Sequence, residues 1–474
     1  MSAAEGNSPH SFLIKTARIT AERAGSRAMD IREAIVEINL YEHLEHPYMT
    51  GTLLIADTVD IYGLGDFQGT EKFEFEAVYS ERFPGPSGSV KKSFIITSID
   101  SMMKGNDNSE IIAFSLTEEH YFKNQMDTIN KSYDGKPIDI IRNIIGDGNL
   151  GVTIDTLNDT GIQEPLRYIA PYLTPLDAAL RVMESAITED GYPFYLYSVL
   201  GSENLLYYRN LKQIFLEDPI SNEPFSYALY KTGLSDSRIA SIVGGDINDP
   251  RNSTNQTRGA VVELEERSRV IEKYHITNQQ NIISLFNKGH IGHTREFVNI
   301  NQFNYHTHKH DMSKVYDRLE NFLPSDQKRT GLDEVAQGGL HLKNSKYITQ
   351  IFSSHTYTTN INNLYDQGST LASYLGLYAT RDAIKAFMEK SAINVEIPGY
   401  HFWPNGSSNP NRTIGRKIPL QFFNNDLEGG EKPSKKVIDK NRSGEYLIYA
   451  ASHQFGLTKY KVSLTCVKYS NQDL

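Results

Sequence analysis

The first third of the chain alternates apolar and polar positions, which predicts β-strands. In GTEKFEFEAVY, apolar side chains alternate with charged ones from Lys72 to Tyr79, the pattern of a strand with one buried face. The runs SFIITSIDSM and EIIAFSLTEE follow, joined by the turn-forming loop MKGNDNS. About four to six strands with short connections predict a small antiparallel barrel or sandwich over residues 1–123.

Helical spacing of apolar residues marks a different unit over residues 124–220. GKPIDIIRNIIGDGN carries isoleucines at helical spacing after Pro137, which suits a first turn. In TPLDAALRVMESAITEDG, Thr174 is a candidate N-cap and Pro175 fits the first helical position. The apolar stripe of this second helix consists of Leu176, Ala179, Leu180, Met183 and Ile187. The hairpin-like runs PFYLYSV and NLLYYRNL complete a predicted α+β unit.

The rest of the chain predicts a second β-unit interrupted by an insertion. GGDINDPRNSTNQTRG has the Gly, Asn, Asp and Pro content of a long exposed loop. Residues 276–384 are polar and Asn-rich with short strand-like pieces, and we interpret them as an inserted domain. Strand patterns return in INVEIP, IGRKIPLQFF and the final hairpin. We therefore assign the second β-unit to residues 221–275 and 385–474.

A weak internal repeat relates the two β-units. The tripeptide Ser-Leu-Thr occurs at 115–117 and at 463–465, each time at the same phase of a predicted strand. Each copy follows another apolar strand, FIITSI or YLIYAA, and GTEKFEF resembles IGRKIPLQF in outline. A three-residue match arises easily by chance, so the order of the surrounding strands is what indicates a duplicated β-domain. The predicted fold is mainly β, with two similar antiparallel barrels, an α+β domain and an inserted domain.

Composition and charge argue against disulfide-linked, membrane-spanning and phosphate-binding proteins. The chain has 474 residues and one cysteine, which excludes an internal disulfide and any Cys-rich zinc site. No apolar run approaches the ~18 residues of a membrane span, so no membrane anchor is expected. The N-terminus lacks the apolar segment of a signal peptide, and the single cysteine favours a protein that is made and kept in a reducing cytoplasm. The net charge of −10 is the opposite of what phosphate-binding proteins usually carry.

The final hairpin raises the question of a Cys/His nucleophile pair. It contains the single cysteine, Cys466, and His453. With the turn near Gly456 and Leu457, His453 should face about Tyr460 and Cys466 about Leu447, ~20 Å apart along the ladder at ~3.3 Å per residue. A nucleophile and its base must lie within ~3 Å of each other. We therefore expect a buried core cysteine and a packed, hydrogen-bonded histidine, and no catalytic pair.

A histidine cluster is the other candidate for chemistry. His306, His308 and His310 alternate in YHTHKHD, with His290 and His293 shortly before. Alternate residues of a strand share one face, so these imidazoles are weak candidates for zinc, nickel or iron ligands. At ~7 Å per step along the strand, one ion would need ligands from another segment or chain. The alternative is an exposed polar strand face. P-loop, GxSxG, HExxH and GxGxxG motifs are absent, so we predict no catalytic or cofactor-binding residues and no enzyme activity.

Three segments in order resemble the baseplate hub proteins of contractile-tailed bacteriophages. They are INLYEHLEHPYMTGTLLIADTVDIYGLGDFQGTEKFEFE, then INKSYDGKPIDIIRNII with TPLDAALRVMESAITEDGYPFYLY, and finally INVEIPGYHFWPNGSSNPNRTIG with GEYLIYAASHQFGLTKYKVSLTCVK. The last segment carries the family-like pattern at Gly444, Tyr446, His453, Phe455, Tyr460 and Leu464. The resemblance covers about two thirds of the chain, and residues 276–384 lie outside it.

The resemblance implies a structural virion protein at the tail baseplate, assembled in the cytoplasm of the bacterial host. In that family, a homotrimer contributes two barrels per chain to a pseudo-sixfold cylinder between the hexameric tail tube and the trimeric spike. Implied partners are the spike, the tail tube or a tube initiator, baseplate wedge proteins, and DNA in transit through the channel. An acidic channel wall would not retard the phosphates of DNA. We expect strands 71–79, 110–118 and 459–468 to build the wall.

Two alternatives stay open at this point. One is the hub of a non-phage contractile injection system, which the sequence does not separate from a phage hub. The other is a cell-wall hydrolase or metalloenzyme that uses the His-rich segment. A monomer holding stoichiometric zinc, lost when His306 and His308 become Ala, would favour the metalloenzyme.

Overall fold

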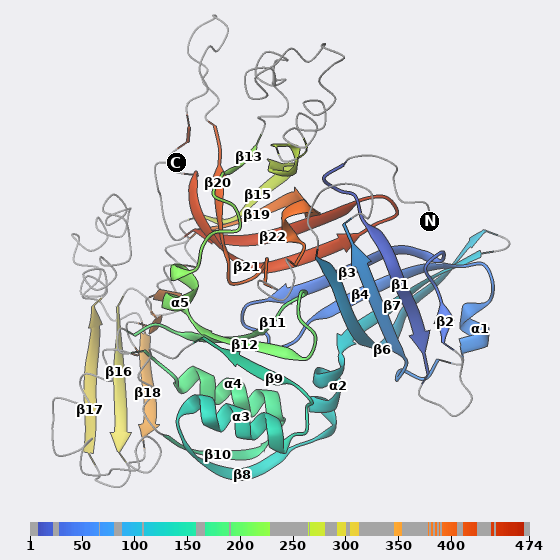
Figure 1. The fold of residues 1–474 in the computed structure, drawn as a ribbon. Helices are drawn as coiled ribbons and strands as arrows, with labels where there is room; N and C mark the ends of the chain where they lie inside the picture. Colours follow the sequence, from blue (N-terminus) through green and yellow to red (C-terminus); the bar gives the residue numbers. More distant parts are fainter. Residues whose placement is uncertain are drawn as a thin grey trace, which may run out of the picture.

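The computed structural model describes most of the chain, with gaps between segments. The described residues are 8–21, 28–65, 67–79, 88–106, 109–157, 166–188, 191–227, 264, 266–279, 292–299, 304–311, 346–352, 378, 381–382, 384–385, 388, 391–404, 411–423, 438–439 and 442–468. The fold is mainly β, with a 14-stranded sheet, three small sheets and a few helices (Figure 1). The predicted fold class is therefore confirmed.

The large sheet contains two ladders of seven strands each. The first ladder runs in the spatial order β3 (Ile35–His43), β4 (Thr50–Asp57), β7 (Ser109–Glu118), β6 (Ser89–Asn106), β5 (Lys72–Val78), β1 (Leu13–Thr20) and β2 (Met29–Asp30). The second runs in the order β15 (Lys273–Gln279), β19 (Ser391–Pro398), β22 (Tyr460–Lys468), β21 (Gly444–Phe455), β20 (Lys417–Gln421), β13 (Phe225–Tyr227) and β14 (Val270–Ile271).

These two ladders have the same topology. When the strands are numbered along the chain within each ladder, both spatial orders read third, fourth, seventh, sixth, fifth, first, second. The four pairings among the third to seventh strands are antiparallel in both ladders. A short helical segment follows the fourth strand in each, α1 (Ile61–Gly65) and the 3-10 helix η4 (Gly399–Phe402).

The two ladders differ in the direction of one strand. The strand β13 runs parallel to its neighbours, whereas its counterpart β1 runs antiparallel.

The repeated Ser-Leu-Thr tripeptide occupies equivalent places in the two ladders. Ser115 of β7 faces Ser98 of β6, and Ser463 of β22 faces Ser452 of β21. The repeated strand order supports the predicted duplication of the β-domain. Closure of either ladder into a barrel stays a prediction.

An α+β unit lies between the first and second ladders in the chain and below the large sheet in Figure 1. Its elements are α2 (Glu119–Met126), β8 (Ile129–Gly135), α3 (Pro137–Asp147), β9 (Thr153–Thr156), β10 (Leu166–Leu173), α4 (Pro175–Ser185), β11 (Phe194–Ser198), β12 (Leu205–Asn210) and α5 (Leu211–Leu216). Both predicted helices begin at their proline. Thr174 is the N-cap residue of α4, as predicted, but its hydroxyl donates to Asp177 Oδ2 at 2.8 Å and makes no hydrogen bond with the helix backbone. Ile187 lies beyond the last turn of α4.

The insertion contains a separate three-stranded sheet. Its order is β17 (Asn304–Asp311), β16 (Gly292–Asn299) and β18 (Lys346–Phe352), and it stands apart from the large sheet in Figure 1. The predicted strand KYITQIF corresponds to β18. The predicted domain limits, including 276–384, stay predictions.

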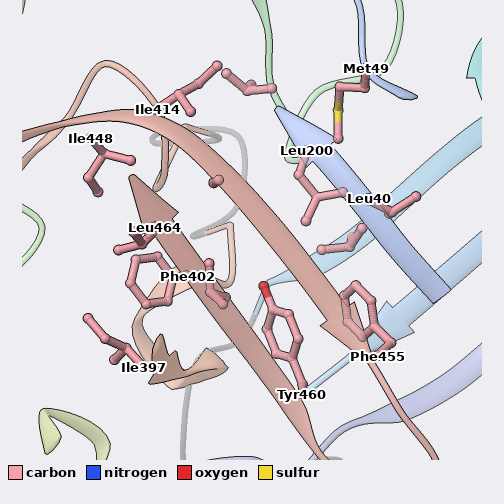
Figure 2. Close-up of a cluster of buried hydrophobic side chains, with 14 of the residues drawn as sticks. Leu40, Met49, Leu200, Ile397, Phe402, Ile414, Ile448, Phe455, Tyr460 and Leu464 are labelled. Carbon is pink, nitrogen blue, oxygen red and sulfur yellow. The ribbon is translucent and has the colours of Figure 1, made fainter. Parts of the chain in front are cut away.

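A single hydrophobic core runs under both ladders, and a second one lies within the α+β unit. Figure 2 shows the first core where the ladders meet, with Leu40 of β3, Phe455 of β21 and Tyr460 of β22 pointing toward one another. The Phe455 ring stacks on Tyr460 with centroids 4.3 Å apart and meets Phe75 of β5 edge to face at 5.1 Å. Because apolar side chains of both ladders share this core, the ladders fold against each other.

Candidate assembly site

Strand pairing joins the two ladders edge to edge. Six residues of β3 pair with six of β21 in antiparallel register, from His43 opposite Ala450 to Ile38 opposite Phe455. The strand β20 pairs with β21 only as far as Leu447, and β3 takes over the same edge from Ala450 onward. One long strand therefore belongs to its own ladder in its first half and connects to the other ladder in its second half.

A buried polar cluster fixes this joint around Glu42 of β3. The Glu42 carboxylate accepts a hydrogen bond from the Leu200 backbone N–H and another from the Thr413 hydroxyl at 2.5 Å. His453 Nε2 lies 3.5 Å from the same carboxylate, and His453 Nδ1 is 2.9 Å from the Tyr460 hydroxyl. Burial is the main cause that raises the pKa of Tyr460 far above its usual value, and the nearby Glu42 charge adds to it. The phenol therefore stays protonated and can donate to the imidazole.

A second buried cluster ties the first ladder to the α+β unit. Lys92 of β6 forms an ion pair with Glu118 of β7, with side chains only 2% and 6% exposed. Glu118 also accepts hydrogen bonds from the Ser198 hydroxyl of β11 at 2.9 Å and from the Met49 backbone N–H at 2.7 Å. Burial alone would raise the Glu118 pKa, but the charges of Lys92 and His120 and the hydrogen bonds from Lys92 and the Met49 backbone outweigh it and hold the pKa below its usual value.

The sequence could have indicated these buried charges. Glu42, Lys92 and Glu118 each lie two residues from a buried apolar residue of the same strand, namely Leu40, Phe94 and Leu116. Alternation along a strand therefore placed all three charges on the core face. A charge at a core position implies a buried partner, and that signal was not used in the sequence predictions.

Two hollows flank His43 at the joint. One of about 480 Å³ is lined by Tyr41, Tyr48, Asn394, Ser463 and neighbours, and one of about 380 Å³ is lined by Tyr195, Lys385, Tyr449 and neighbours. Burial is the main cause that lowers the His43 pKa, and the neighbouring His46 lowers it further, so this imidazole is neutral at neutral pH. Rings surround it, with His46 at 4.5 Å and Tyr449 at 5.0 Å between centroids.

The final hairpin is confirmed, with a corrected register. Phe455 faces Tyr460, so His453 faces Val462 where Tyr460 was predicted, and Cys466 faces Ile448 where Leu447 was predicted. The turn spans residues 456–459, and a β-bulge between Ile448 and Ala450 shifts the pairing beyond it. His453 and Cys466 remain far apart along the ladder and form no pair.

Cys466 is the buried core residue that the sequence predicted, and burial raises its thiol pKa. His453 is fully buried and lies at hydrogen-bond distance from Tyr460, as predicted. This part of the hairpin is therefore structural.

The predicted histidine cluster lies on β17, away from the joint. His306, His308 and His310 pair in the ladder with Phe297, Arg295 and His293 of β16. Their side chains lie outside what the structure describes, and so does His290. Within the described side chains, no group of three or more His, Cys, Asp or Glu is arranged to hold a metal ion. The metal hypothesis for the histidines stays untested.

Comparison with known proteins found similar solved structures only. No protein-family model and no curated protein sequence matches the chain. A tail protein from Neisseria meningitidis MC58 is similar with a TM-score of 0.48 at 10% identity, covering 96% of both chains. The 43 kDa tail protein of prophage MuSo2 from Shewanella oneidensis has a TM-score of 0.46 at 9% identity, covering 96% of this chain and 98% of that one.

A third similar structure is the Escherichia coli c3393 protein, a component of the type VI secretion system. Its TM-score is 0.40 at 8% identity, covering 97% of this chain and 77% of that one. The similar structures are thus phage tail proteins and a secretion-system component. At these identities no residue role can be carried over. None of the helices in the described segments is long and apolar enough to span a membrane.

Proposed function

We propose that this chain is a structural protein of a contractile tail, the central hub of its baseplate. The observation that carries the proposal is the ladder that occurs twice in one chain and is joined edge to edge through β3 and β21. A chain that supplies two equivalent wall segments doubles the rotational order of a ring. Three chains then present six segments, so a threefold spike can meet a sixfold tube. The sequence resemblance to baseplate hubs independently favours this reading.

In this role the chain acts mechanically, without catalysis. A homotrimeric ring in the virion tail would bind the spike on one side and the tail tube or a tube initiator on the other, with wedge proteins around it. The rigid connection between the ladders supports such a role. The joint combines six backbone pairings, a shared hydrophobic core and the buried Glu42 cluster, so its geometry is fixed before assembly.

The sheet face opposite the core suits a channel wall. Its side chains around the joint are mostly small and uncharged, including Thr52, Ser115, Asn394, Ser452 and Ser463. Lys461 on this face is neutralised by Glu396 at 2.6 Å and Glu272 at 2.7 Å. Such a face offers DNA phosphates few cations to bind, so DNA in transit would not be held.

The test is assembly of the purified chain. Native mass measurement should give a trimer, and electron microscopy should give a ring with threefold symmetry and six similar wall segments. Mixing with the spike and tube proteins of the same particle should give a stack with one spike and one tube end per ring. A stable monomer at micromolar concentration, or a ring with a net basic lumen, would contradict the proposal.

A further inference from the structure

Among the strands of five or more residues in the large sheet, β15 and β6 present a long edge with no partner strand within the described residues. One is the outer edge of β15, whose other edge pairs with β19. The other is the later part of β6, because β5 pairs with β6 only as far as Ile95 while β7 continues beyond it. Exposed strand edges present unpaired N–H and C=O groups that readily pair with another chain.

The counterparts of these edges are already paired with each other inside the chain. In the repeated strand order, β15 corresponds to β3 and β6 corresponds to β21. The strands β3 and β21 form the joint between the ladders. We propose that β15 of one copy pairs antiparallel with the later part of β6 of a second copy, repeating this joint between chains.

The repeated Ser-Leu-Thr tripeptide aligns the two ladders residue by residue, and this alignment sets the register of the proposed pairing. Within the chain, Tyr41 of β3 faces Ser452 of β21. Ser452 faces Ser463, and the equivalent serine of the first ladder, Ser115, faces Ser98. On this alignment Ser98 takes the place of Ser452.

The partner of Ser98 follows from the threonines of the repeated tripeptide, Thr117 and Thr465. Thr117 faces Thr50, which faces Tyr41. Thr465 faces Asn394, which faces His275 of β15. His275 therefore takes the place of Tyr41, and the register places His275 of one copy opposite Ser98 of the next.

Charge and exposure at the two edges agree with this register. Asp100 lies in a β-bulge of β6 on the same face as Ser98, where its carboxylate accepts hydrogen bonds from the Ser98 and Ser115 hydroxyls. The register brings Lys273 beside this bulge, which gives a pair of opposite charges across the strands. Lys273 is 76% exposed in the single chain. Further along β6, Met102 and Met103 are 41% and 59% exposed, so this free edge carries two adjacent apolar side chains. A second copy would cover them.

The two edges lie on different ladders, so the contact runs head to tail, and copies related by one third of a turn close into a ring. Three copies would alternate internal and intermolecular joints of one kind. The inference therefore rests on the proposed ring and adds to it the strands, register and partner that close it.

Paired cysteines test the register directly, since opposite residues of an antiparallel pair have Cβ atoms about 4.5–5.5 Å apart. The variant His275→Cys/Ser98→Cys should form covalent multimers on mild oxidation, seen on a non-reducing gel. Tyr41→Cys/Ser452→Cys is the matched positive control. Its two introduced thiols should form a disulfide within one chain, so the protein should still run as a monomer on the gel. In His275→Cys/Met102→Cys the cysteines are offset by about 13 Å and should not crosslink. Each variant with only one of the introduced cysteines should also stay uncrosslinked, since the native Cys466 is buried.

The outcomes separate the two proposals. Crosslinking of the matched pair alone supports the register. A native trimer in which the matched pair fails while the internal control oxidises overturns the β15–β6 pairing and leaves the hub proposal standing. A wild-type monomer overturns the ring itself.

Reversal of charge gives a second readout. Asp100→Lys should weaken each intermolecular contact by up to about fivefold, because it places like charges opposite each other. Asp100→Lys/Lys273→Asp should restore the trimer. Equal weakening in both variants would contradict the predicted neighbours.

Discussion

The buried Lys92–Glu118 pair allows a quantitative test of how the first ladder is held to the α+β unit. Breaking a buried ion pair by removing one partner usually costs about 3–5 kcal/mol, because the other charge is left uncompensated. The two single substitutions should differ here. In Lys92→Met, Glu118 keeps hydrogen bonds from Ser198 and Met49, so we expect a loss near the lower limit, about 3 kcal/mol.

The reciprocal change, Glu118→Gln, should cost more. The neutral amide has one acceptor oxygen, so it cannot accept from both Lys92 and the Met49 N–H, and the buried ammonium group loses its opposite charge. The other contact of the ammonium group is the Ser198 hydroxyl at 3.5 Å. We expect a loss near the upper limit, about 5 kcal/mol. The double variant Lys92→Met/Glu118→Gln removes both charges, and its loss should be at least about 2 kcal/mol smaller than the sum of the single losses.

Urea unfolding of the four proteins provides the measurement. Far-UV circular dichroism follows the whole chain, while the fluorescence of the single tryptophan, buried Trp403, follows the second ladder. The first ladder should unfold at lower urea in the variants. If Lys92→Met costs as much as Glu118→Gln, or if the two losses simply add, the argument from the remaining hydrogen bonds is wrong.

Acid titration of the same proteins checks the sign of the pKa shift. The folded-state pKa of Glu118 is depressed, so its contribution to stability is present above about pH 4.3, the usual Glu value, and is lost as pH falls through the folded pKa. In Lys92→Met, burial is no longer offset by the ammonium charge, so the Glu118 pKa should rise. The loss of stability on acidification that is due to Glu118 should then shrink or reverse.

Three further predictions concern the second ladder and the helices. Tyr460→Phe should cost about 1–3 kcal/mol in urea unfolding, since it leaves a buried ring nitrogen of His453 without its partner at 2.9 Å, and an unchanged midpoint would contradict that role. Native protein should not react with a thiol reagent, because Cys466 is buried with a raised pKa, whereas unfolded protein should react fully; rapid native labelling would be the contrary result. Gly399→Ala should lower the thermal midpoint, because a Cβ there would lie 1.9 Å from the Tyr460 ring, whereas the control Gly146→Ala in α3, with no atom within 4 Å of its Cβ, should gain about 0.5–1 kcal/mol.

Local patterns predicted the elements well. Alternation from Lys72 to Tyr79 gave β5, and helical spacing after Pro137 and Pro175 gave α3 and α4. These predictions succeed because each depends on which face of a short segment is buried, and that is written in adjacent residues. The repeated Ser-Leu-Thr tripeptide, with the order of the strands around it, also indicated the duplicated β-domain.

Register was harder to predict. The bulge near Tyr449 shifted the pairing of Cys466. Every residue from 446 to 451 is apolar, so the change of phase that the extra residue causes cannot be seen in the hydrophobic pattern. The joint between β3 and β21 was not predicted either, because it pairs residues about 400 positions apart, such as Glu42 and Ala451. Only the folded arrangement brings these edges together.

The sequence by itself determined the strand and helix content, the structural role of Cys466 and His453, and the presence of two related β-units. The tertiary structure alone decided that these units share one strand order, one core and one edge-to-edge joint. The reason is physical: a strand's buried face is fixed by its own alternation, whereas its partner is chosen by whichever edge the whole chain brings alongside. The same choice leaves β15 and β6 as the edges where a second copy can pair.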